Sequence, residues 1–258
     1  MGKTIPNKLY KYRPWDDFTK EIILENKLYF SCADDFNDPF DCSVNLKMDG
    51  TKKQWSNEVI KTKAQTLGRN LSHKERKIIC NAFDLKQMSH VKKEMVEELT
   101  KRLKKTMGIC CFSSCKDNIL MWSHYADNHK GVCLIFSSKD MHAARKVNYE
   151  INYPNVSYFN DDEEKKVNAR YFTKAINWKY EDEYRVVVPN FARQKIKFPP
   201  ESLTGVIIGC CMPDKDIEEL SKILKNSVIP IMLYRAEKKN CQFGLSIEPI
   251  KRYGTENN

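Results

Sequence analysis

The sequence predicts a mixed α+β fold with one helical, basic segment near its middle. Short apolar stretches typical of strands alternate with stretches of helical period along the whole chain. Hydrophobic residues make up 41% and charged residues 30%, a balance typical of globular proteins. Only 9 of the 258 residues are glycine, and neither GxGxxG nor GxxxxGK[ST] occurs, which argues against Rossmann and P-loop enzymes.

The first elements are expected as strand, helix and strand. Residues 9–13 (LYKYR) form a strand, and Asp16 or Asp17 caps a helix that ends near residue 25. A second strand follows at 28–31. Residues 33–41 contain Asn-Asp-Pro, which blocks a helix and favours turns, so we expect a loop there.

Helical period takes over from about residue 53 to 106, where Ser72 and Glu75 have the spacing of a capping box. After Gly108 the strand signal returns. Pro213 suits the start of a helix that continues to about residue 225. We expect strands at 109–113, 131–137, 183–189, 205–209, 231–236 and 243–250, and helices at 119–126 and 162–172.

The net charge of +10 is concentrated in the helical segment. Residues 51–106 carry 15 Lys/Arg against 6 Asp/Glu, whereas the rest of the chain carries 29 against 28. A basic surface of this kind attracts nucleic acid by releasing counterions, although a solvated helical face has the same composition. We expect one domain over residues 1–258 with a basic insertion at 51–106, and nucleic-acid contacts by Lys92, Lys93, Lys101, Arg102, Lys104 and Lys105.

No targeting, membrane or metal signal is found. The first 20 residues lack the apolar core of a signal peptide, and the longest apolar stretch, 206–212, is far shorter than the ~18 residues of a membrane helix. We therefore expect a cytoplasmic protein with no membrane partner. The ten cysteines include no CxxC pair, so reduced thiols and no metal site are expected.

Two clusters in the first 40 residues combine polar and aromatic side chains. In the first strand, Lys11 and Arg13 alternate with Tyr10 and Tyr12, and Arg suits a bidentate contact to phosphate or carboxylate. In FNDPF, two aromatic rings bracket Asn37 and Asp38, which either bond the local backbone or face a ligand.

Two further clusters lie later in the chain. The helix after Ser113 carries Trp122, His124 and Tyr125, and helical spacing places His124 and Tyr125 with Met121 near one face. Such aromatic side chains fill a core or frame a stacked ring. In YEDEYRVVV, Glu181, Glu183 and Arg185 alternate to one face of a strand. A carboxylate beside an Arg can hold a ribose hydroxyl, stabilise a developing cation or act as a base.

These four clusters resemble a bacterial family described only as a domain of unknown function. The resemblance rests on LYKYR, KLYFSCADDFNDPFD, CCFSSCKDNILMWSHYADNHKGVCLIF and YEDEYRVVV, which occur in this order. It covers the chain outside the basic segment. The layout of that family is similar to the ADP-ribosyltransferase fold, which implies a mainly antiparallel sheet core.

The resemblance implies an NAD-dependent ADP-ribosyltransferase that modifies nucleic acid and acts as a toxin or antiphage defence effector. It implies that Glu183 is the catalytic carboxylate and that no metal is needed. Residues implied at the NAD site are Lys11, Tyr12, Arg13, Asn37, Asp38, Ser113, Trp122, His124, Tyr125 and Arg185. A protein partner such as an antitoxin would keep the activity silent.

Three alternatives stay open at this point. An NAD glycohydrolase would release nicotinamide with water as the acceptor. A nucleic-acid-binding protein without catalysis would depend on the basic segment alone. A nuclease would use Asp38, Asp41 and Glu183 as metal ligands, but their spacing matches no two-metal pattern, so this alternative ranks last.

Overall fold

A computed structural model describes residues 5–82, 89–227 and 229–254 of the chain. The helices are α1 (Asp17–Glu25), α2 (Lys52–Leu67), α3 (His73–Ala82), α4 (Ser89–Thr106), α5 (Ile119–Tyr125), α6 (Glu163–Tyr171) and α7 (Asp214–Lys225). The strands are β1 (Lys8–Arg13), β2 (Lys27–Phe30), β3 (Asn45–Lys47), β4 (Met107–Ser113), β5 (Val132–Ser137), β6 (Arg145–Lys146), β7 (Asn148–Glu150), β8 (Asn155–Ser157), β9 (Thr173–Ala175), β10 (Glu183–Pro189), β11 (Gln194–Lys197), β12 (Leu203–Ile208), β13 (Ile231–Lys238) and β14 (Leu245–Tyr253).

An eight-stranded sheet organises the molecule, in the order β14-β13-β12-β5-β1-β4-β10-β6. As described, its neighbouring strands are antiparallel except β12 and β13, which are parallel. The prediction of a mixed α+β fold with a mainly antiparallel sheet is therefore confirmed. Each strand expected from the sequence has a counterpart within a few residues of the predicted bounds.

The helix ends follow from local side-chain chemistry. Asp16 is the N-cap of α1, and its carboxylate accepts a hydrogen bond from the backbone N–H of Thr19 at 2.8 Å. Ser72 and Glu75 form the predicted capping box before α3. Pro213 precedes α7, as expected for a residue that lacks the N–H a helix start leaves unused.

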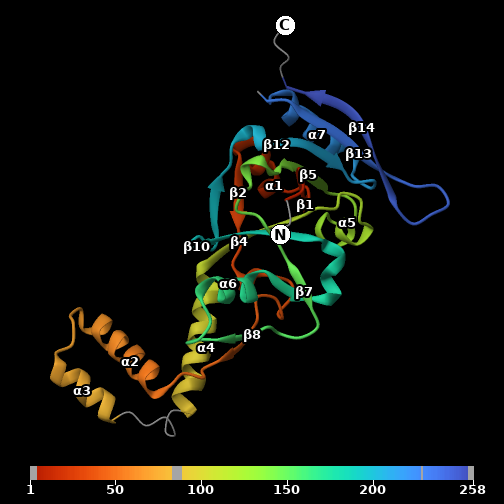
Figure 1. Ribbon diagram of the computed structural model, residues 1–258. Helices are drawn as coiled ribbons and strands as arrows, with labels where there is room; N and C mark the ends of the chain where they lie inside the picture. The colour runs from red at the N-terminus through yellow and green to blue at the C-terminus, as the bar shows by residue number, and fades with distance from the viewer. Residues whose placement is uncertain (1–4, 83–88, 228, 255–258) are drawn as a thin grey trace.

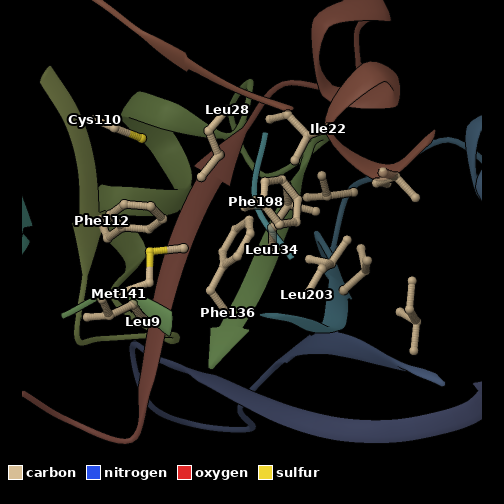
Figure 2. Close-up of a cluster of buried hydrophobic side chains, with 14 of the residues drawn as sticks. Leu9, Ile22, Leu28, Cys110, Phe112, Leu134, Phe136, Met141, Phe198 and Leu203 are labelled. Carbon is tan, nitrogen blue, oxygen red and sulfur yellow. The ribbon is translucent and has the colours of Figure 1, made fainter. Parts of the chain in front are cut away.

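Alternation along the strands builds a core on each face of the sheet. On one face, Leu134 and Phe136 of β5 pack with Leu9 and with apolar side chains of α1 and α7 (Figure 2). On the other face, Cys133 and Ile135 pack with Met121 and Trp122 of α5. The sheet is thus covered on both sides, and α5 holds the face that bears the aromatic cluster.

The helices expected between residues 51 and 106 are present as α2, α3 and α4. Figure 1 shows α2 and α3 projecting away from the sheet, whereas α4 runs back to β4. The base of α2 is anchored by Trp55, which is fully buried and packs edge-on against Phe159 at 4.9 Å between ring centroids. The division of the chain into a domain and an insertion stays a prediction.

The described helices include none that is long and apolar enough to cross a membrane. Three two-stranded sheets, β11-β2, β3-β8 and β7-β9, were not predicted in full. All six of these strands have only three or four residues, and each pairs with a segment that is not its neighbour along the chain. Neither the local hydrophobic period nor the turn residues predict pairing between such segments.

Candidate functional site

The large sheet is open between β1 and β4. β1 pairs with β5 from Lys8 to Arg13 but with β4 only at Tyr10, opposite Ser113. On its other edge, β4 pairs with β10 over seven positions. A cavity of about 650 Å³ lies at this opening and is lined by side chains of both strands. A cavity of this size is in the range of small-ligand and cofactor sites.

Backbone groups of both strands face the opening. Ile109 exchanges two backbone hydrogen bonds with Ser31, on the edge of β4 that faces away from β10. In an antiparallel strand every second residue directs its N–H and C=O to the same edge, so those of Cys111 face this edge as well. The Cys111 carbonyl accepts a hydrogen bond from Lys11 Nζ at 3.0 Å. The same alternation from Tyr10 turns the backbone N–H and C=O of Tyr12 toward β4. The opening therefore offers a donor and an acceptor side by side.

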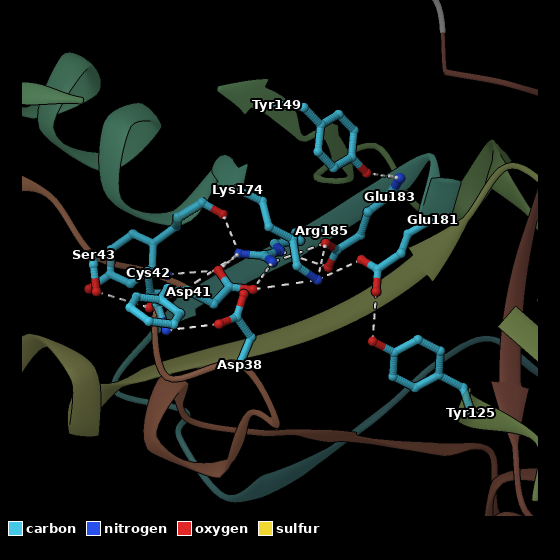
Figure 3. Close-up of polar contacts among 12 residues, drawn as sticks. Asp38, Asp41, Cys42, Ser43, Tyr125, Tyr149, Lys174, Glu181, Glu183 and Arg185 are labelled. Atoms are coloured by element: carbon cyan, nitrogen blue, oxygen red, sulfur yellow. Dashed lines mark hydrogen bonds and ion pairs between the residues drawn. The ribbon is translucent and has the colours of Figure 1, made fainter. Parts of the chain in front are cut away.

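A buried guanidinium lies at the inner end of the cavity. Arg185 is 0% exposed and holds two carboxylates in bidentate fashion (Figure 3). Its Nη1 and Nη2 donate to Asp41 at 2.9 and 2.6 Å, and its Nε and Nη2 donate to Glu183 at 2.7 and 2.9 Å. Bidentate pairs fix both position and orientation, so the Glu183 carboxylate has a single well-defined place.

A second carboxylate, Glu181, lies between a cation and a phenol. Lys174 Nζ is 2.5 Å from Glu181 Oε2 and 3.5 Å from Glu183 Oε2. Tyr125 Oη donates to Glu181 Oε1 at 2.6 Å (Figure 3). Glu181, Glu183 and Lys174 are all buried and line the same cavity. Three carboxylates and two cations thus share one buried network.

The two glutamates differ in their protonation equilibria. Burial raises the pKa of Glu183, but the charges of Arg185 and Lys174 outweigh it and lower that pKa to about 2. Burial also raises the pKa of Glu181, and there the attraction of Lys174 does not fully offset it, so the pKa lies above its ordinary value. Neighbouring carboxyls with separated pKa values are suited to different tasks, and here Glu183 is the one whose ionised form is more strongly stabilised.

Helix α5 forms another wall of the cavity. Asn118 caps it by accepting hydrogen bonds from the backbone N–H groups of Leu120 and Met121. Met121, His124 and Tyr125 line the cavity, as their helical spacing predicts. Trp122 does not: it is fully buried and packs edge-on against Tyr12 at 5.2 Å. The structure therefore gives Trp122 a packing position beneath the site.

Two cations of β1 lie on the cavity wall. Lys11 has no carboxylate partner among the residues that the structure describes, and its ammonium lies 5.3 Å from the centroid of Phe112. Arg13 is 30% exposed and lies 3.6 Å from Asp16. Both cations remain within reach of an anionic ligand.

The structure brings most of the predicted site residues together. Those lining the cavity are Lys11, Tyr12, Arg13, Asn37, Ser113, His124, Tyr125, Glu183 and Arg185. Asp38 does not line it: this side chain is buried and accepts from the backbone N–H of Phe40 at 2.9 Å. The six predicted nucleic-acid-binding cations all lie on α4.

The sequence did not single out Lys174, and it placed Glu181 on a strand. Glu181 instead ends a 3-10 turn at Ile176–Glu181, and Asp182 has a left-handed backbone (φ 42°) before β10 begins. Glu183 and Arg185 do alternate to one face of β10 as expected. A lone Lys in the short strand β9 has no local pattern that distinguishes it from a surface cation, so only the fold reveals its position.

Within the part of the chain that the structure describes, no group of three or more His, Cys, Asp or Glu side chains is arranged to hold a metal ion. The carboxylates of Asp41 and Glu183, which a nuclease would use, are both bound to Arg185. Nothing in this arrangement favours the nuclease alternative.

Comparison with known proteins gives one match. Residues 121–186 match a family described as "Protein of unknown function (DUF2971)". This match supports the resemblance to a domain-of-unknown-function family. The chain has no significant match among curated proteins or solved structures. The matched segment begins in α5, ends in β10 and includes Tyr125, Lys174, Glu181, Glu183 and Arg185.

Proposed function

We propose that the chain is an NAD-dependent ADP-ribosyltransferase of the ADP-ribosyltransferase fold type. The observation that carries the proposal is the cavity between β1 and β4, with an ionised carboxylate fixed at its inner end. Tyr10, Ser113 and Glu183 are register partners across β1, β4 and β10. Motifs more than 170 residues apart in sequence therefore converge on one line across the sheet.

The groups of β1 fit the parts of an NAD molecule. A primary carboxamide needs one acceptor and one donor side by side, which the backbone C=O and N–H of Tyr12 offer at the opening. Lys11 and Arg13 supply positive charge for the pyrophosphate. Asn37, Ser113 and His124 contribute polar groups to the remaining wall.

Glu183 suits the cleavage step. In that step the bond between C1′ of the ribose and the nicotinamide nitrogen breaks, and nicotinamide leaves with the electron pair. The ribosyl group becomes cation-like, so a fixed negative charge stabilises it. The low pKa of Glu183, about 2, keeps the carboxylate ionised at neutral pH. Arg185 orients it from behind.

Glu181 suits the transfer step. The acceptor nucleophile forms a new bond to C1′ and releases one proton. Glu181 has a raised pKa and lies beside the Tyr125 hydroxyl in the same cavity, so it can take up that proton. In this scheme Lys174 holds Glu181 in position, and Glu181 accepts the hydrogen bond from Tyr125.

The acceptor in this proposal is nucleic acid, because the chain carries a strongly basic segment at residues 51–106. An enzyme that consumes NAD and modifies nucleic acid would harm its own cell. We therefore propose a toxin or antiphage effector whose activity a protein partner restrains.

The test is turnover of labelled NAD with DNA, RNA or neither. Wild type and Glu201→Gln, a control at an exposed glutamate, should release nicotinamide and label one nucleic acid. Glu183→Gln should lower both by at least about a hundredfold, the scale of removing a transition-state charge contact. Nicotinamide release without label would favour the glycohydrolase, and no turnover with any acceptor would refute the enzyme proposal.

A further inference from the structure

A strongly basic surface lies on α2, α3 and the turn between them. We call this segment, residues 52–82, the basic hairpin. It carries eight Lys/Arg and two Asp/Glu. The cations Lys52, Lys53, Lys61, Lys63, Arg69, Lys74, Arg76 and Lys77 are all exposed. Figure 1 shows the hairpin extending from the body, so its sides are free of the sheet.

Little in the described chain neutralises this charge. Glu75 pairs with Arg69 at 2.8 Å and also closes the capping box with Ser72. The Glu58 carboxylate accepts a hydrogen bond from Tyr158 Oη at 3.0 Å, so it is directed toward the body of the protein. The other seven cations of the basic hairpin make no ion pair with a described carboxylate. A projecting element with uncompensated like charges is costly to the free protein, and a polyanion would remove that cost.

The predicted cations on α4 are in a different setting. Lys101 and Arg102 follow Glu97 and Glu98 by four residues each, the spacing at which opposite charges on a helix attract. All of α4 carries six Lys/Arg against three Asp/Glu. The basic hairpin therefore has the larger net charge, +6 against +3, and the fewer internal partners.

The form of the basic hairpin favours a duplex over a single strand. Proteins that hold single strands stack bases on exposed aromatic rings. Residues 52–82 contain one Phe, Tyr or Trp residue, Trp55, and it is fully buried. α2 has 16 residues, so it presents a straight edge about 24 Å long. The major groove of B-form DNA admits a helix, whereas that of duplex RNA does not.

We propose that the basic hairpin is a docking surface for duplex DNA. It holds the phosphate backbone through Lys61, Lys63, Lys74 and Lys77, which stand on both helices. This inference rests on the proposed function in one respect, namely that the bound DNA is the acceptor of the ADP-ribosyl group. Binding itself needs neither NAD nor the cavity.

The experiment measures binding of a fluorescent 24-base-pair duplex by anisotropy, without NAD, at several salt concentrations. The test variant changes Lys61, Lys63, Lys74 and Lys77 to Gln. The matched control changes Lys215, Lys222, Lys225 and Lys239 to Gln, four exposed lysines on α7 and at the end of β13. Circular dichroism and thermal unfolding show that each variant is folded.

Wild type and the control should bind with similar affinity. The test variant should bind at least tenfold more weakly. The slope of its plot of log K against log salt concentration should be shallower by about 3 to 4, because four phosphate contacts are lost and each contributes about 0.9 to the slope. Equal losses in both variants, wild-type binding by the test variant, or tighter binding of single-stranded DNA or duplex RNA would overturn the proposal. If DNA binding behaves as expected but NAD is not cleaved, only the proposed enzyme activity fails.

Discussion

Arg185 is the residue on which the site geometry depends most. Its guanidinium is fully buried and is bonded to both Asp41 and Glu183. Lys174 lies beside the same carboxylates but contacts them at 3.5 to 3.6 Å. Removing Arg185 would leave two buried carboxylates with one weaker partner, which is costly in a low-dielectric interior.

We expect Arg185→Met to lower the free energy of unfolding by about 3–5 kcal/mol, the range for breaking a buried ion pair. Arg193→Met is the matched control, since Arg193 pairs with Asp35 on the surface and its side chain is 56% exposed. That loss should stay below about 1 kcal/mol. Urea unfolding at pH 7 measures both. Similar losses for the two variants would show that the buried network does not stabilise the fold.

Glu183 also makes stability depend on pH. Its pKa falls from an ordinary value of 4.5 to about 2 in the folded chain. The ionised group therefore stabilises the fold fully above pH 4.5, and this contribution is lost as the pH falls toward 2. Urea unfolding of wild type between pH 5 and 2.5 should show this loss. Glu183→Gln lacks the titrating group, so its free energy of unfolding should fall less over the same window. Parallel curves would contradict the assignment.

Among the helices, α2 is attached to the body by a packed aromatic pair and by hydrogen bonds from Tyr158 to Glu58 and from Gln54 to Asn160. Trp55 is fully buried against Phe159, and Lys92 Nζ of α4 lies 5.5 Å from its ring centroid. The Cβ of any residue other than glycine at position 50 would come within 2.3 Å of the Phe159 ring. The Phe159 ring is therefore packed between Gly50 and Trp55, and a large-to-small change at Trp55 should loosen α2.

Trp55→Ala should cost about 3–5 kcal/mol where the contact forms, as for other buried aromatic side chains. Limited trypsin digestion should then cut within residues 52–106 much faster than in wild type. Phe243→Ala is the control, because Phe243 is fully exposed and its loss should leave the digestion pattern unchanged. An unchanged pattern in Trp55→Ala would show that α2 is held by other contacts.

The helices and strands could be predicted from the sequence for physical reasons. The strands of the large sheet have clear apolar stretches, and α1, α3 and α7 have capping residues or proline at their starts. The positions of the site residues were harder to predict. Trp122 and Tyr125 stand three residues apart on one helix, yet one is core and the other faces the cavity. Lys174 joins the site only through the pairing of β9 with β7, which local sequence does not encode.

At the scale of the whole molecule, two features with different chemistry stand apart in the chain. The sheet opening gathers side chains from β1, β4, α5 and β10 around a cavity of about 650 Å³. The basic hairpin lies outside the sheet and carries a net charge of +6. We assign catalysis to the cavity and DNA docking to the basic hairpin, so mutations should affect the two functions separately.

The four-lysine variant of the basic hairpin should therefore keep the basal NAD cleavage that occurs in the absence of DNA, in which water takes the place of the acceptor at C1′. Its cavity is unchanged, because none of the four lysines lines it. Nicotinamide release without acceptor, compared with wild type, should agree within about twofold, whereas labelling of DNA should fall with the binding affinity. A parallel loss of both activities would show that the hairpin and the cavity are not independent.

The opening between β1 and β4 should hold NAD, and a crystal structure of Glu183→Gln grown with NAD would reveal it. We expect the nicotinamide carboxamide within hydrogen-bond distance of the Tyr12 backbone, and the pyrophosphate near Lys11 and Arg13. NAD bound elsewhere, or an empty opening at saturating NAD, would contradict it.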